Sequence, residues 1–171
     1  MNRVFIPVIL AAGSFLLAQP NTKTPGEAEA TIGGKTIAVK YQAASANGRS
    51  IFGDRALLQP NTVWRAGVGN PTTLYTSAEL NLGGLDVKPG QYTLYVLVDP
   101  KGWQLIVSKE KGAAAIVYHK EQDLGRVAMT TRHPAAPVET MKFSVNAAGG
   151  RSGTLQLAWA DVAASVPFTL K

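Results

Sequence analysis

Runs of alternating apolar and polar side chains recur along the chain, and this two-residue period constrains its fold more than any other feature. Ile37, Val39 and Tyr41 fall on one face of such a run, and residues 154–159 alternate in the same way. Successive side chains of a β-strand point to opposite faces of a sheet, so this period indicates half-buried strands. Residues 91–98 are apolar on both faces, which is typical of a central strand covered on both sides.

Turn residues separate these runs at short intervals. Gly33 and Gly34 suit the positive φ angles of a tight hairpin, and Pro89 with Gly90 suits a β-turn. No helical pattern of ten residues follows the N-terminal segment, and we expect roughly nine to eleven short strands. The sequence therefore predicts an all-β fold: a single antiparallel β-sandwich, jelly-roll or immunoglobulin-like, whose strand order stays open.

The first residues have the pattern of a secretory signal peptide. A short basic start is followed by apolar or small residues at positions 4–17, with Ala18 as the last residue of the expected cleavage site. This run is shorter than the roughly 20 residues that span a bilayer, although an uncleaved anchor is the alternative. We expect a signal peptide over residues 1–18, an extended lead-in over 19–27 and the sandwich domain over 28–171. The protein is then exported, to the periplasm or the medium, with no membrane span after cleavage.

Composition excludes several classes of function. The net charge is +6, but the charges are scattered, so we expect no nucleic-acid partner. The chain has no cysteine, and its two histidines, His119 and His133, lack the short spacing of a zinc pair. We therefore expect no metal site, no cofactor and no catalytic residues, and a monomer or weak oligomer.

Residues 48–77 lack the strand pattern and form the candidate site. Residues 43–60 are expected to form a long loop over one end of the sandwich, with a helical turn at residues 54–58, and residues 72–76 to form a strand. Arg49 and Arg65 carry forked donors for carboxylate, phosphate or sulfate, and Trp64 offers a flat apolar face for a sugar ring. With Asn70 they are predicted to line one pocket for a small anionic ligand or sugar. The structural alternative has Trp64 covering the core, while Arg49 and Arg65 bind Asp54 or backbone carbonyls.

An ordered series of motifs resembles a known bacterial family. GRSIFG, VWRAG, the Gly83–Gly84 pair, KPGQYTLYV and the following Trp103, then QDLGRVAM and LQLAWADVAASVPFTL, are similar to domain of unknown function 2911. The resemblance covers residues 28–170 and implies an exported β-sandwich domain without an assigned activity.

One departure from that family bears on catalysis. Members continue the W-R-x-G motif with a small residue, then Asn, Glu, Ala and Thr, whereas this chain has Gly69 and Asn70 at the Asn and Glu positions. The resemblance thus implies that a cation site or general base built on that pair is lost here. The sequence favours a non-catalytic binding module for a small molecule or carbohydrate. A hydrolase of an extracellular carbohydrate or ester, and a structural protein of the cell envelope, remain alternatives.

Overall fold

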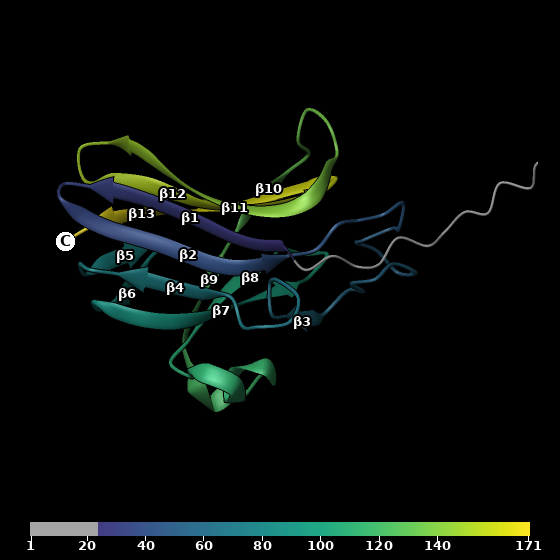
Figure 1. The fold of residues 1–171 in the computed structure, drawn as a ribbon, viewed down its shortest axis with the longest axis horizontal. Coiled ribbons are helices and arrows are strands. Elements are labelled where there is room, and N and C mark those ends of the chain that lie inside the picture. The colour runs from purple at the N-terminus through teal and green to yellow at the C-terminus, as the bar shows by residue number, and fades with distance from the viewer. Residues whose placement is uncertain (1–23) are drawn as a thin grey trace, which may run out of the picture.

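Two antiparallel β-sheets pack face to face in the computed structural model, which describes residues 24–171 (Figure 1). The seven-stranded sheet has the order β1 (Thr24–Ile32), β2 (Lys35–Ala43), β4 (Thr73–Thr76), β7 (Gly90–Val98), β8 (Gln104–Ser108) and β9 (Asp123–Ala128), with β3 (Thr62–Trp64) also paired to β7. The six-stranded sheet has the order β11 (Val138–Gly149), β12 (Ser152–Ala160), β13 (Val162–Leu170), β5 (Leu80–Leu82) and β6 (Leu85–Val87), with β10 (Thr130–Arg132) paired to β13. The predicted all-β sandwich is confirmed, and the structure supplies its strand order.

The first hairpin forms where the glycine pair predicts it. Gly33 and Gly34 have φ angles of 55° and 71°, as a tight turn between β1 and β2 requires. The strand begins earlier than expected, because Thr24 pairs with Ala43 and Glu27 with Lys40. Residues 24–27 therefore belong to the sheet and not to an extended lead-in. The expected signal peptide and residues 19–23 lie outside the described residues.

Aromatic side chains close one end of the core. The rings of Trp64 and Trp159 stack with centroids 5.5 Å apart, although they come from different sheets. Phe52 packs edge-on against Trp103, with ring centroids 4.8 Å apart, and contacts Trp159 at 6.0 Å. Trp103 and Trp159 are both core residues, with 8% and 2% of their surfaces exposed.

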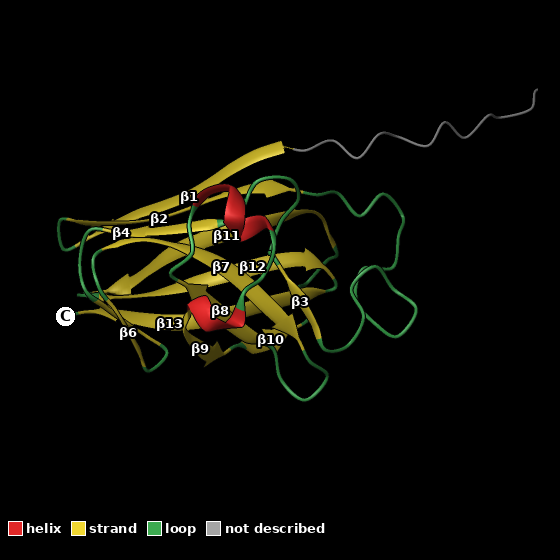
Figure 2. Ribbon diagram, turned by 90° about the horizontal axis from the view of Figure 1, so that it is seen from below, coloured by secondary structure: helices red, strands yellow, loops and turns green. Residues whose placement is uncertain are grey.

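The loop over residues 44–61 plugs this end of the sandwich, as expected. Ile51 and Leu58 are buried, and the backbone N–H of Leu58 donates to the carbonyl of Ile51 at 2.8 Å. The expected helical turn is absent from residues 54–58, where the chain instead forms turns and bends. Figure 2 shows these loops at the end of the sandwich away from the C-terminus.

The chain changes sheets within a stretch that reads as one strand. The sequence of residues 127–132 predicts a single strand, but β9 pairs with β8, and β10 pairs with β13 in the other sheet. Met129 lies between them, and its N–H donates to the carbonyl of Trp103 at 2.8 Å. Val127 and Met129 are buried, whereas all three residues of β10 are exposed, so the core side of this stretch ends at Met129.

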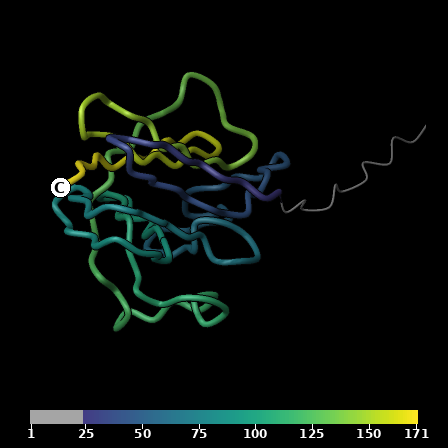
Figure 3. Tube along the Cα trace, turned by 60° about the vertical axis from the view of Figure 1, so that its left-hand side comes forward, coloured from purple at the N-terminus to yellow at the C-terminus, as the bar shows by residue number. Residues whose placement is uncertain are grey.

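Residues 109–122 cover part of the outer face of the seven-stranded sheet. They contain two short 3-10 helices, η1 (Gly112–Ile116) and η2 (Lys120–Gln122), and Figure 3 shows them as the green loop at the bottom of the trace. Beneath them Tyr95 and Ile106 are at most 1% exposed. Residues 109–122 are here called the cover, and they explain why residues 91–98 are apolar on both faces. Among residues 24–171, no helix is long and apolar enough to cross a membrane.

Candidate functional site

The four residues of the predicted pocket lie in three separate depressions. Arg49 borders a depression of about 380 Å³, together with Glu139 and Asp161. Trp64 and Arg65 border another of about 250 Å³, and Asn70 a third of about 480 Å³. The structure therefore brings only Trp64 and Arg65 together, and the single shared pocket is not formed.

Arg49 holds the loop in place. Its Nε donates to the carbonyl of Ala46 at 2.9 Å, and its Nη2 donates to the carbonyl of Ser45 at 2.7 Å. The same loop is tied to β11, because the N–H of Asn47 donates to Glu139 Oε1 at 2.7 Å. This geometry matches the structural alternative for Arg49, in which backbone carbonyls are its acceptors.

Trp64 belongs to the core. Its indole packs inward on Trp159, with the ring planes 24° apart, and the residue is only 9% exposed. A sugar ring stacks on an aromatic face that solvent can reach. The prediction that Trp64 offers such a face is therefore wrong, and Trp64 covers the core instead.

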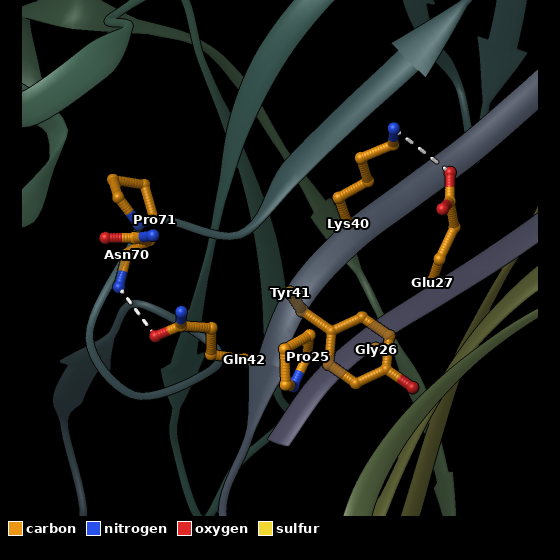
Figure 4. A pocket seen from close by; sticks show the side chains of 8 residues that line it. All are labelled: Pro25, Gly26, Glu27, Lys40, Tyr41, Gln42, Asn70 and Pro71. Carbon is orange, nitrogen blue, oxygen red and sulfur yellow. Dashed lines mark hydrogen bonds and ion pairs between the residues drawn. The ribbon is translucent and has the colours of Figure 1, made fainter. Parts of the chain in front are cut away.

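Asn70 lies on the rim of the largest of the three depressions (Figure 4). Its backbone N–H donates to Gln42 Oε1 at 3.2 Å, and the N–H of Val68 donates to the Gln42 carbonyl at 3.0 Å. The loop after β3 therefore docks on β2, which carries Asn70 away from Arg65.

The depression around Arg65, here called the Arg65 pocket, lies between the sheet and its cover. Its lining consists of Thr62, Val63, Trp64, Arg65, Tyr95, Ile116 and Tyr118. Val63 pairs with Leu97 on β7, and this register sets Arg65 beside Tyr95 on the outer face. Arg65 is half-buried as a residue, and its guanidinium makes no hydrogen bond or ion pair with the described residues.

Tyr95 forms a neutral wall of the Arg65 pocket. Burial, followed by the charges of Glu110 and Asp123, raises the pKa of Tyr95 to about 12, although Arg65 opposes these effects. The phenol donates to the carbonyl of Ala115 at 2.7 Å, which anchors the cover to β7. Tyr95 is therefore protonated at neutral pH and acts as a structural donor.

A polar network lies behind the second tyrosine. The Tyr118 hydroxyl donates to Asp123 Oδ2 at 2.8 Å, and Arg126 Nε donates to the same oxygen at 3.0 Å. Arg126 Nη2 also donates to the Tyr118 hydroxyl. Burial, and then the bond to Asp123, raises the pKa of Tyr118. The other carboxylate oxygen, Asp123 Oδ1, is buried without a hydrogen-bond partner among the described residues.

An ion pair joins two residues within the cover. His119 Nδ1 lies 2.7 Å from Glu110 Oε2, and this hydrogen bond, followed by the charge of Glu110, raises the pKa of His119. Across residues 24–171, no group of three or more histidine, aspartate and glutamate side chains is placed to hold a metal ion.

Sequence reasoning missed the tyrosines and Ile116 of the Arg65 pocket. A signal was present, because the outer face of residues 91–98 is apolar and must be covered by another segment. Residues 113–118 are the apolar stretch that covers it, and they bring Ile116 and Tyr118 to Arg65.

The fold and these depressions define an all-β sandwich protein with open depressions on its surface. The chain belongs to the family described as protein of unknown function (DUF2911), whose model matches residues 23–168. The resemblance of the motifs to this family is confirmed, and the match covers nearly all of the sandwich. No curated protein matches the chain, and no solved structure does.

Proposed function

We propose that the protein is a non-catalytic binding module, and that its Arg65 pocket takes a small organic anion. The observation that carries this proposal is the guanidinium of Arg65, which lies beside Tyr95 and makes no hydrogen bond or ion pair with the described residues. A guanidinium presents a planar fork of donors that matches a carboxylate in two parallel hydrogen bonds. Solvent reaches these donors, so a ligand oxyanion would displace water and gain charge-assisted hydrogen bonds at Arg65.

The rest of the lining favours a small ligand with an apolar part. Val63 and Ile116 supply aliphatic surface, and Ile116 is 45% exposed. The volume of about 250 Å³ is below the range of pockets for drug-sized molecules, roughly 300–1,000 Å³. These features suit a short aliphatic or aromatic carboxylate, with its carboxylate at Arg65 and its apolar end at Ile116.

The surroundings support binding over hydrolysis. A hydrolytic site needs a nucleophile or water activated by a base within hydrogen-bond reach, and the lining of the Arg65 pocket includes no histidine and no carboxylate. The nearby carboxylate of Asp123 already accepts from Tyr118 and Arg126. The pocket therefore offers groups that orient a ligand and none that activate one.

The N-terminal pattern supports a proposal about the cellular location of the protein. A basic start, an apolar run over residues 4–17 and Ala18 together suit export, so the module would meet its ligand outside the cytoplasm. A chain without cysteine needs no oxidising compartment to fold.

A thermal-shift screen of purified protein against short carboxylates, phosphate, sulfate and neutral sugars tests the proposal. A ligand at about one hundred times its Kd stabilises the protein by about 2.7 kcal/mol, which raises Tm by roughly 5–10 °C at this chain length. We expect this shift from a carboxylate with an apolar group, its loss in Arg65→Gln, and its retention in the control Arg132→Gln on β10. No shift from any carboxylate, or an equal shift in Arg65→Gln, overturns the proposal.

A further inference from the structure

The outer face of the seven-stranded sheet is covered over only part of its width. Thr93 Oγ1 on β7 donates to the Glu110 carbonyl at 2.8 Å, so the cover begins at this residue and extends over β8. Figure 1 shows the short helices below β7 and β8, whereas β1 and β2 form the edge of the sheet farther from these helices. The outward side chains of β1, β2 and β4 therefore form an open polar face.

The strand register hollows this face into a groove. Glu29 lies opposite Ala38, and Ala38 opposite Tyr75, so the smallest side chain of this row stands between two large ones. Ala38 is 4% exposed and Tyr75 45% exposed. The groove thus follows β2, with β1 as one wall and β4 as the other.

Two depressions join end to end along this line. One, of about 300 Å³, has the lining Glu27, Glu29, Thr36, Ala38, Lys40, Thr73, Tyr75 and Gln91. The other, of about 480 Å³, is the depression of Figure 4, and both are bordered by Glu27 and Lys40. The floor runs from Thr36 to Gln42, a distance of about 20 Å at the rise of a β-strand. We call this continuous surface the β2 groove; it shares no residue with the Arg65 pocket.

The side chains of the β2 groove suit a chain rich in hydroxyl groups. Tyr75 offers an exposed ring for the C–H face of a sugar, and hydroxyl and amide side chains flank it. Those polar side chains are Thr36, Thr73, Gln91, Gln42 and Asn70. An added peptide strand is excluded along the floor, because the backbone of β2 is already paired with β1 and with β4.

The charge of the β2 groove is opposite in sign to that of the whole chain. Two carboxylates, Glu27 and Glu29, face the single ammonium of Lys40, so the groove carries one net negative charge on a chain of net charge +6. Lys40 Nζ lies 3.3 Å from Glu27 Oε1. Glu29 makes no ion pair or hydrogen bond with the described residues. This sign disfavours an anionic polysaccharide and leaves Glu29 available for a cation.

We propose that the β2 groove binds an extended glycan chain that carries free amino groups. In this complex a sugar ring stacks on Tyr75, a neighbouring ammonium meets Glu29, and the hydroxyl groups bond to the threonine and amide side chains. The chain lies along β2 and passes the Lys40–Glu27 pair at the junction of the two depressions.

Calorimetric titration of the purified protein with oligosaccharides of equal length tests this proposal. The probes are glucosamine, N-acetylglucosamine, glucose and galacturonate oligomers, with oligolysine as a polycation of matched charge. We expect glucosamine oligomers to bind most tightly, the two neutral oligomers more weakly, and galacturonate oligomers and oligolysine not at all. Tight binding of oligolysine would show that the β2 groove recognises positive charge alone, and would overturn the proposal.

Substitutions in the β2 groove separate its two contacts. Tyr75→Ala should weaken every oligosaccharide about tenfold. Glu29→Gln should lower the affinity for glucosamine oligomers to that of the neutral ones, whereas the control Glu121→Gln in the cover should change neither. Unchanged affinity in Tyr75→Ala, or no binding of glucosamine oligomers to a protein of native melting temperature, contradicts the proposal. Because Arg65→Gln leaves this surface intact, failure here and failure of the anion site are distinguishable.

Discussion

Trp64 and Trp159 stack across the two sheets of the sandwich, with ring centroids 5.5 Å apart and ring planes 24° apart. Trp64 comes from the three-residue strand β3 and Trp159 from the long strand β12. The pair, with Phe52 against Trp159, therefore joins a short strand and a long loop to the centre of the fold.

Removal of the Trp64 ring should destabilise the protein strongly. Trp64→Ala removes a buried side chain and leaves a cavity in the core, a change that costs about 3–5 kcal/mol. At this chain length we expect Tm to fall by roughly 10 °C in a thermal melt. The control Trp64→Phe, which keeps an aromatic contact with Trp159, should lose less than half as much. Equal losses in the two variants would contradict a stabilising role of the stack.

The Gly83–Gly84 turn offers a matched pair of substitutions. A Cβ at Gly83 would lie 2.3 Å from Val127 Cγ1 and 2.9 Å from Val166 Cγ1, whereas a Cβ at Gly84 would meet nothing within 4 Å. Both residues have positive φ angles, 54° and 99°. Gly84→Ala should therefore cost only backbone strain, about 1 kcal/mol, and Gly83→Ala about 1–3 kcal/mol more from overpacking. Urea denaturation measures both, and a smaller loss for Gly83→Ala would contradict this packing.

The His119–Glu110 pair should make stability depend on pH. The hydrogen bond and charge of Glu110 raise the pKa of His119 in the folded protein. The contribution is then fully present below the unfolded pKa of about 6.5 and is lost as pH rises through the folded value. We expect His119→Gln to lower Tm more at pH 5.5 than at pH 8.5. Glu110→Gln should also lower Tm more at pH 5.5 than at pH 8.5, because it removes the same ion pair. An equal effect of His119→Gln at both pH values would contradict the ion pair.

The N-terminal segment gives a prediction about processing. If residues 1–18 are a signal peptide, secretion by a bacterial host should yield a protein that begins at Gln19. Intact-mass measurement of the secreted protein checks this directly, with Ala18→Leu as the variant that blocks cleavage. A secreted protein that retains Met1 would contradict cleavage after Ala18.

The sandwich was predictable because its signals are local. Gly33 and Gly34 mark the first turn, and alternation marks β12, so the sequence predicts both without long-range information. The sheet change at Met129 was not predictable, because no proline or glycine separates β9 from β10, and only their pairing partners place them in different sheets. The start of β1 at Thr24 was missed for a similar reason. Pro25 and Gly26 disfavour a strand, but pairing with β2 overrides that preference.

The candidate site was less predictable than the fold. Arg49, Arg65 and Asn70 lie close together in sequence, but they follow different elements and reach three depressions. The loop after β3 docks on Gln42, which separates Asn70 from Arg65. The tyrosines and Ile116 that line the Arg65 pocket come from β7 and from the cover, about 30 and 50 residues further along the chain, and spacing in sequence does not reveal such contacts.

The most direct test of the central claim is a crystal structure of the protein soaked with a bromine-substituted aromatic carboxylate that stabilises it in the thermal-shift screen. We expect the anomalous signal of bromine beside Val63 and Ile116, with the ligand carboxylate within hydrogen-bond distance of the Arg65 guanidinium. Bromine density elsewhere, with the Arg65 pocket empty, would contradict the claim that this pocket binds organic anions.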